Sequence, residues 1–225
     1  MAFERALPPQ YEMDAAVERA RKQASRETLI QALERIRVWS ERNNPAVARA
    51  LRPGLSEAEI DARTKDLPFR LPREAYWLYG WRNGTGRAPG VFFLYHQWPS
   101  LEDALAEYQG LLDLGLGWNR MWFPLFWFQD EHFFHACGEG SAEALPVLKH
   151  FLEDTDIPIS FTNLTTLALT QAEGLESGAF WVTDREQGFL EMHNGSLSRI
   201  HQRLNPGASY PYYVDPRESP PPSKG

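Results

Sequence analysis

Apolar residues recur along much of the chain at intervals of three or four positions, the spacing that places them on one face of a helix. In the first long stretch, Leu29, Leu33 and Ile36 share such a face. The pattern predicts helices over residues 14–42, 57–66, 72–80, 101–112, 163–173 and 197–204. Short apolar runs bounded by turn residues predict strands over residues 91–95, 121–128, 132–137, 146–151, 178–183 and 188–192.

Local capping signals support several of these boundaries. Ser56 and Glu59 have the spacing of a capping box, in which each side chain bonds the backbone beside the other. Pro72 suits the start of a helix, where its missing N–H has no cost. Ser100 and Thr162 are expected to cap the helices that follow them.

The order of the elements indicates the fold class. Helices cluster in the first half of the chain and strands in the middle, which favours an α+β fold over alternating β-α-β units. We expect a central antiparallel or mixed sheet of about five to six strands flanked by helices. Residues 1–44 are predicted to form a helical extension and residues 45–207 the main domain. Residues 208–225 form a Pro-rich tail that we expect to be disordered.

Composition narrows the classes of partner and the compartment. The 225 residues include 23 Lys and Arg against 30 Asp and Glu, giving a net charge of −7. This charge disfavours nucleic acid, whose binding depends on neutralised phosphates. Cys137 is the single cysteine, so no intrachain disulfide forms, as expected in a reducing compartment. With no apolar run near the roughly 18 residues that span a bilayer, we expect a cytoplasmic protein without a membrane partner.

The negative charge is concentrated in residues 101–160, which hold eleven acids and two bases, a charge of −9, while the remainder of the chain carries +2. Such a segment would steer a basic protein toward it, although a merely solvated surface has the same composition. The candidate partner-binding acids are Glu102, Asp103, Glu107, Asp113, Asp130, Glu131, Glu153, Asp154 and Asp156.

An aromatic block follows in residues 118–128 and is typical of a core strand with both faces covered. Trp118 differs from the rest of the block because it falls in a Gly-rich loop, where binding residues are often found. We therefore add Trp118 to the candidate partner-binding residues.

One cluster contains the residue types that bind zinc: Glu131-His132-x-x-His135-x-Cys137. On a strand His135 and Cys137 share one face and His132 points to the other. Only two ligands then converge, fewer than zinc requires. We expect no metal site, no cofactor and no catalytic residues.

An ordered set of short motifs resembles a known family. The segment Leu71-Pro72-x-x-x-Tyr76-x-Leu78-Tyr79-x-Trp81-x-Asn83-Gly84 is similar to the signature of the SUKH superfamily, in the branch typified by the fungal Smi/Knr regulators of cell-wall synthesis. The order continues with Trp98-Pro99-Ser100-Leu101-Glu102, Trp122-Phe123-Pro124-Leu125-Phe126, Pro146-Val147, Phe161-x-x-Leu164-Thr165 and Asn205-Pro206-Gly207. The resemblance covers residues 45–207.

The resemblance implies a compact α+β domain without a catalytic centre. Bacterial members of this superfamily are similar to immunity proteins, which bind and neutralise polymorphic toxins, and fungal members act through protein contacts. The leading expectation is therefore a non-enzymatic immunity protein whose partner is a basic toxin domain. The alternatives are a regulatory scaffold that recruits endogenous partners and an unrecognised metal-dependent hydrolase.

Overall fold

The fold is α+β in the computed structural model, which describes residues 7–86, 92–115, 117–129, 131–138, 140–151, 156–184, 186–215 and 217. Helices in these residues are α1 (Gln10–Gln23), α2 (Arg26–Asn43), α3 (Pro45–Ala50), α4 (Glu57–Thr64), α5 (Arg73–Trp81), α6 (Leu101–Asp113), α7 (Leu164–Ser177) and α8 (Asn194–Leu204). Strands are β1 (Trp122–Phe128), β2 (Glu131–Ala136), β3 (Val147–Phe151), β4 (Ile159–Phe161), β5 (Phe180–Asp184) and β6 (Phe189–Met192).

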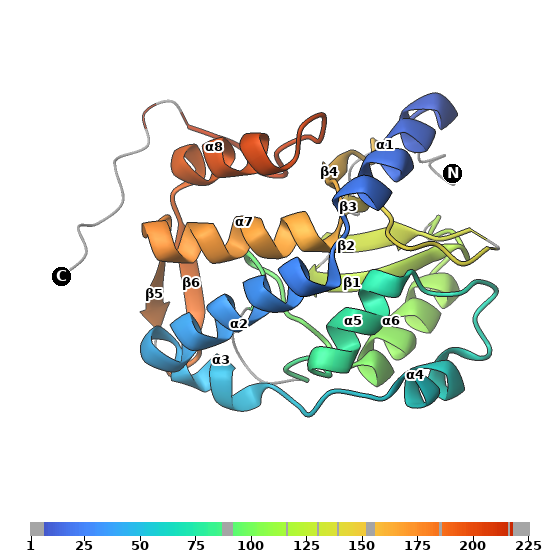
Figure 1. The fold of residues 1–225 in the computed structure, drawn as a ribbon, viewed down its shortest axis with the longest axis horizontal. Helices are drawn as coiled ribbons and strands as arrows, with labels where there is room; N and C mark the ends of the chain where they lie inside the picture. The colour runs from blue at the N-terminus through green and yellow to red at the C-terminus, as the bar shows by residue number, and fades with distance from the viewer. Residues whose placement is uncertain are drawn as a thin grey trace.

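The central sheet is antiparallel and has the order β1-β2-β3-β4. It is smaller than the predicted five to six strands, because β5 and β6 pair only with each other and pack beside α7 as a separate two-stranded sheet. In Figure 1 this hairpin lies at one end of α7, away from the central sheet. The strands predicted over 121–128, 132–137, 146–151, 178–183 and 188–192 are confirmed within one or two residues.

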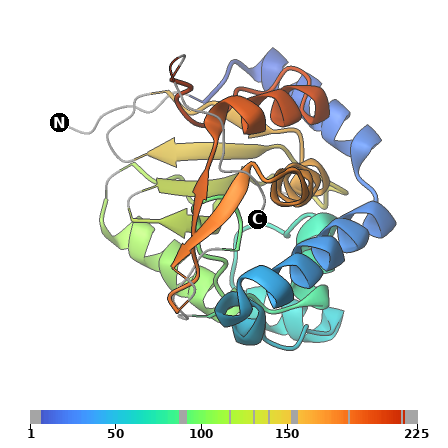
Figure 2. The same cartoon turned by 90° about the vertical axis from the view of Figure 1, so that its left-hand side faces the viewer.

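Both faces of the central sheet are buried. On β2, Phe133 enters a large core with α2, α5, α6 and α7, whereas its neighbour Phe134 enters a second, smaller cluster. Because successive strand residues point to opposite faces, the run of aromatics in β1 and β2 fills both cores. Leu197 of α8 also belongs to the large core, whereas Ala16 of α1 belongs to the second cluster. In Figure 2 the red helix α8 lies above the row of strands and the green helix α6 below it.

The helix predicted over 14–42 is two helices. Ala24 and Ser25 have extended backbones, with ψ values of 129° and 118°. Ser25 begins α2, since its hydroxyl accepts a hydrogen bond from the Thr28 N–H at 3.2 Å. The Ser25 N–H points to Thr165 Oγ1, which lies 3.5 Å away on α7.

The segments assigned to the two ends of the chain contribute to the interior. On α2, Leu29, Leu33 and Ile36 are at most 1% exposed and belong to the main core, and α2 runs alongside α7 (Figure 1). Tyr210 and Tyr212, within the predicted tail, also pack against this core. Neither the extension nor the first residues of the tail are therefore appendages to the main domain.

The strand predicted over 91–95 is wrong for the described residues 92–95. Leu94 has a φ of 53°, and the chain turns so that the His96 N–H donates to the Phe93 carbonyl at 2.7 Å. The Leu94 N–H donates to Gln171 Oε1 at 2.9 Å rather than to a neighbouring strand. The apolar character of this segment reflects a buried turn, because Phe92, Phe93 and Leu94 are each at most 2% exposed.

The capping predictions differ in accuracy. The box at Ser56 and Glu59 is present, and Ser100 caps α6. The cap of α7 is Asn163 rather than Thr162, because the Asn163 carboxamide accepts from the Thr166 N–H at 2.9 Å. The sequence also gave no sign of β4, a three-residue edge strand formed only by pairing with β3.

Candidate functional site

A tight turn fixes the start of α6, the helix that carries four of the nine predicted acidic residues. Asn83 Oδ1 accepts from the Leu101 N–H at 2.8 Å, and Asn83 Nδ2 donates to Glu102 Oε2 at 3.0 Å. Gly84 has a φ of +67°, and a Cβ there would lie 2.1 Å from the Pro99 carbonyl oxygen. The Asn-Gly pair therefore positions α6, because the Asn83 carboxamide bonds the start of the helix and the close approach at position 84 requires glycine.

The structure brings only some of the predicted acids together. Four lie on α6, which has no basic residue: Glu102, Asp103, Glu107 and Asp113. Glu131 begins β2, and Asp156 is exposed before β4. Asp130, Glu153 and Asp154 lie outside the described residues.

Two of these acids are neutralised within the protein. Glu102 Oε1 lies 2.6 Å from Arg63 Nε. Although burial raises its pKa, hydrogen bonds from Asn83 and Arg63 lower the pKa of Glu102 to about 2. Glu131 is bound by Lys149 at 2.8 Å and lies 2.9 Å from His96 Nε2. These pairs reduce the charge that Glu102 and Glu131 offer to a partner.

Asp103 and Glu107 lie beside a small pocket, which we call the acidic pocket. Its volume is about 380 Å³, and its lining residues are Gly86, Gln97, Pro99, Asp103, Ala106, Glu107 and Trp127. Ser100 Oγ donates to Asp103 Oδ2 at 2.7 Å, and His132 Nε2 donates to Glu107 Oε1 at 2.9 Å. The presence of Trp127 and Gln97 beside these acids could not be predicted, because the residues come from three separate segments.

Trp118 is an interior residue rather than a surface for a partner. Its side chain is 8% exposed, and Nε1 donates to the Trp122 carbonyl at 3.1 Å. The ring packs against Trp122, Phe134 and His150 in the second cluster. The Gly-rich loop folds this ring onto the sheet, so the prediction of a partner-binding Trp118 is not supported.

The zinc-like residues engage other groups. His132 contacts Glu107, whereas His135 Nδ1 donates to the Pro146 carbonyl at 3.0 Å. Burial lowers the pKa of His135 to about 4, so this ring is neutral at physiological pH. Burial raises the pKa of the Cys137 thiol, which disfavours the thiolate that binds metal. Among the described residues no three His, Cys, Asp or Glu side chains converge as metal ligands.

A buried polar network links the sheet to the C-terminal segment. Tyr212 Oη lies 3.4 Å from His96 Nδ1, and Lys149 Nζ donates to the Pro211 carbonyl at 2.7 Å. The Lys149 ammonium also lies 4.8 Å from the centre of the Tyr212 ring. The Tyr-His-Glu order resembles a proton relay, but His96 is fully buried and none of these residues lines a pocket described here. The geometry indicates a structural role, in which these contacts hold the C-terminal segment against the sheet.

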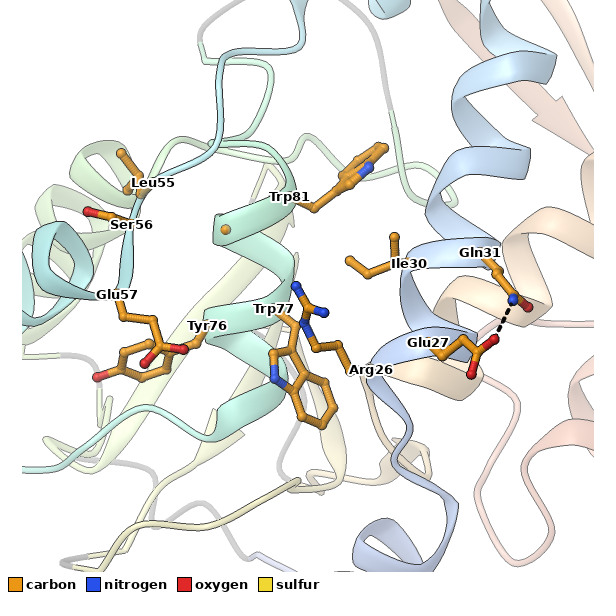
Figure 3. Close-up of a pocket in the computed structure, with 11 residues that line it drawn as sticks. Arg26, Glu27, Ile30, Gln31, Leu55, Ser56, Glu57, Tyr76, Trp77 and Trp81 are labelled. Atoms are coloured by element: carbon orange, nitrogen blue, oxygen red, sulfur yellow. Dashed lines mark hydrogen bonds between the residues drawn. The ribbon is translucent and has the colours of Figure 1, made fainter.

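A larger groove separates α2 from α5 and the start of α4. Its volume is about 830 Å³. Figure 3 draws Ile30 on the α2 side of this space and Trp77 and Trp81 on the α5 side. Charged residues at its rim include Arg26 and Glu57. This groove was not predicted, because the helical patterns of α2 and α5 give no indication of the distance between the two helices.

Comparison with known proteins leaves the site to be interpreted from its own chemistry. No protein-family model and no curated protein matches the sequence. Within the part of the chain that the structure describes, none of the helices combines the length and apolar character needed to cross a bilayer.

Proposed function

We propose that this protein acts by binding another protein, without chemistry of its own, as an immunity protein that neutralises a basic toxin domain. The observation that carries this proposal is the charge of α6, which has four carboxylates and no basic residue of its own, and two of these carboxylates, Asp103 and Glu107, line the acidic pocket. The ordered resemblance of residues 45–207 to the SUKH superfamily supports the same function.

The charge on α6 favours a basic partner for a physical reason. Opposite charges on two surfaces speed the diffusional encounter, by tenfold to a thousandfold at low salt. Asp113 is exposed and Asp103 and Glu107 are partly exposed, so their field reaches solvent. The ion pair with Arg63 makes Glu102 the weakest contributor.

The proposal is tested with the protein product of a toxin gene that neighbours this one. The two proteins are co-purified, and inhibition of the toxin and the association rate are measured over a series of salt concentrations. The variant Asp103→Asn/Glu107→Gln/Asp113→Asn should slow association by roughly tenfold at low salt and flatten its salt dependence.

A matched control is available on other surfaces. Glu12→Gln/Asp66→Asn/Glu186→Gln removes the same charge from three exposed positions outside α6. Equal association rates in the two triple variants would count against α6 as the docking surface. Turnover of a small molecule by the purified protein would count against a purely binding role.

The groove between α2 and α5 favours a second function, a regulatory scaffold for endogenous partners. Its half-buried Trp77 and Ile30 offer apolar area to a protein segment. Trp77→Ala should then weaken partner capture while Asp103→Asn/Glu107→Gln has no effect. Deletion of residues 1–44 cannot make this distinction, because it removes the core residues Leu29 and Leu33.

A further inference from the structure

The C-terminal segment, residues 208–213, is attached to the rest of the fold by tertiary contacts. None of its residues belongs to a helix or a strand. The Ser209 N–H donates to the Ile159 carbonyl of the edge strand β4 at 2.8 Å. The Tyr210 hydroxyl donates to Asn194 Oδ1, at the start of α8, at 2.8 Å. A segment held in this way can detach at a smaller free-energy cost than the strands and helices of the core.

Three side chains from different parts of the chain, His96, Lys149 and Tyr212, form the central attachment, which we call the His96 cluster. Lys149 donates to the Pro211 carbonyl and lies beside the Tyr212 ring. Tyr212 Oη lies 3.4 Å from His96 Nδ1, and Glu131 Oε1 lies 2.9 Å from His96 Nε2. The Glu131 carboxylate favours a proton on Nε2, which leaves Nδ1 as the acceptor for the Tyr212 hydroxyl.

We propose that the C-terminal segment is a pH-sensitive strap, which detaches from the sheet when His96 takes up a proton at Nδ1. Detachment would uncover the edge of β4 and the apolar core surface on which Tyr210 and Tyr212 pack. The inference describes a conformational change of this chain and does not depend on the proposed function.

Protonation of His96 opposes the attached state for two reasons. An imidazolium has two N–H donors and no acceptor, so the Tyr212 hydroxyl would lose its acceptor. The His96 side chain is also fully buried, and a charge without water around it is costly. Because Nδ1 is the ring atom that faces Tyr212, detachment of the segment exposes this atom to water.

The surrounding charges set the direction of the pH dependence. Burial is the largest influence and lowers the pKa of His96 from its ordinary value of 6.5, Glu131 raises this pKa, and Lys149 lowers it. Detachment reduces the burial and leaves Glu131 in place on β2, so the pKa of His96 is higher in the detached state. Attachment is therefore strongest above about pH 6.5 and weakens as the pH falls below this value. The titratable groups around His96 in the described residues are Glu131 and His132 on β2, Lys149 on β3, Tyr95 beside it in the sequence and Tyr212.

Hydrogen exchange of the Ser209 amide tests the proposal, because the bond from Ser209 to Ile159 exists only while the segment is attached. The exchange rate is measured by NMR at pH 7.5 and pH 5.5 and divided by the intrinsic rate at each pH. We expect the protection of this amide to fall by roughly threefold to tenfold at pH 5.5. The amides of α7 should not lose protection, because only the C-terminal segment opens.

Four variants complete the experiment. His96→Gln retains a donor and an acceptor but does not titrate, so the pH dependence should disappear. Tyr212→Phe should lower the protection at pH 7.5, whereas the matched control Tyr213→Phe removes a hydroxyl from a residue that is 78% exposed and should have no effect. His201→Gln should keep the pH dependence, although His201 is also buried and its ring lies 5.4 Å from that of Tyr210. Circular dichroism establishes that each variant is folded.

Several outcomes would overturn the pH-sensitive strap. Equal protection of the Ser209 amide at the two pH values is one, and loss of protection throughout α7 at pH 5.5 is another. A pH dependence that persists in His96→Gln, or that disappears in His201→Gln, would assign the effect to another group. If His96→Gln does not fold, unchanged protection in Tyr212→Phe overturns the proposal. None of these measurements includes a partner, so their failure is distinct from failure of the proposed function.

Discussion

Glu74 is a fully buried carboxyl on α5 whose titration should control the stability of the protein near neutral pH. It joins α5 to the start of α7, where it accepts hydrogen bonds from the Leu164 N–H at 3.1 Å, the Thr165 N–H at 2.9 Å and the Thr165 hydroxyl at 2.5 Å. Burial raises the pKa of Glu74 to about 7, and the hydrogen bonds from Thr165 and Leu164 offset only part of this effect. The folded chain therefore holds a proton that the unfolded chain releases at lower pH.

The sign and size of the effect follow from this difference. Between the ordinary value of 4.5 and about 7, the folded state binds more protons, so the free energy of unfolding decreases as pH rises. The stabilisation is fully present below pH 4.5 and lost above pH 7. One pKa unit corresponds to about 1.4 kcal/mol, which gives a total on the order of 3 kcal/mol.

The perturbation is Glu74→Gln, which keeps the shape of the side chain and removes its titration. Urea unfolding at pH 5 and pH 8 measures the free energy of unfolding for both proteins, with Glu12→Gln as an exposed control. Glu74→Gln should be less stable at pH 5 by roughly 1–3 kcal/mol, because its amide group meets a backbone donor. From pH 5 to pH 8 the unmodified protein should lose about 2–3 kcal/mol more than the variant.

Two results would refute this reasoning. Identical pH dependence in the two proteins would show that Glu74 does not titrate in this range. A difference that widens toward pH 8 would show that the helix donors hold the carboxylate ionised, against the effect of burial.

Three further substitutions test other parts of the structure. Leu33→Ala should lower the free energy of unfolding by about 2–5 kcal/mol, because it opens a cavity in the core beneath α2; a loss below about 0.5 kcal/mol, as on a surface, would argue against this packing. Gly84→Ala should cost at least about 2 kcal/mol in chemical unfolding, since its φ of +67° is strained for alanine and its Cβ would meet the Pro99 carbonyl; an unchanged midpoint would contradict this. Lys149→Met should release the C-terminal segment by removing its contacts with Pro211 and Tyr212, seen as faster chymotrypsin cleavage near Tyr212, and unchanged cleavage would show that other contacts hold the segment.

Features encoded over a few neighbouring residues could be predicted from the sequence. The box at Ser56 and Glu59 and the cap at Ser100 were predicted because each depends on contacts three residues apart. The aromatic runs of β1 and β2 were predicted as strands joined by a turn, and they pair in that way. The acids on α6 were also assigned to one helix, because the apolar residues around them recur at helical spacing.

Features that depend on distant residues could not be predicted. The turn at residues 92–95 is held by Gln171, 77 positions from Leu94, and β4 exists only through its pairing with β3. Arg63 neutralises Glu102 from 39 positions away, which no count of charges along residues 101–160 could reveal.

The sequence by itself thus determined the α+β class, most of the helices and strands, and the concentration of acids in one stretch. Only the tertiary structure decided that Glu102 and Glu131 pair with bases, that Trp118 is interior, and that Trp127 and Gln97 join Asp103 and Glu107 around one cavity. The physical reason is the distance along the sequence between the residues that interact. Hydrogen bonds and side-chain spacing within one helix or strand depend on residues a few positions apart. A pocket, in contrast, depends on the packing of helices and strands that are far apart in the sequence, and these contacts form only when the whole chain folds.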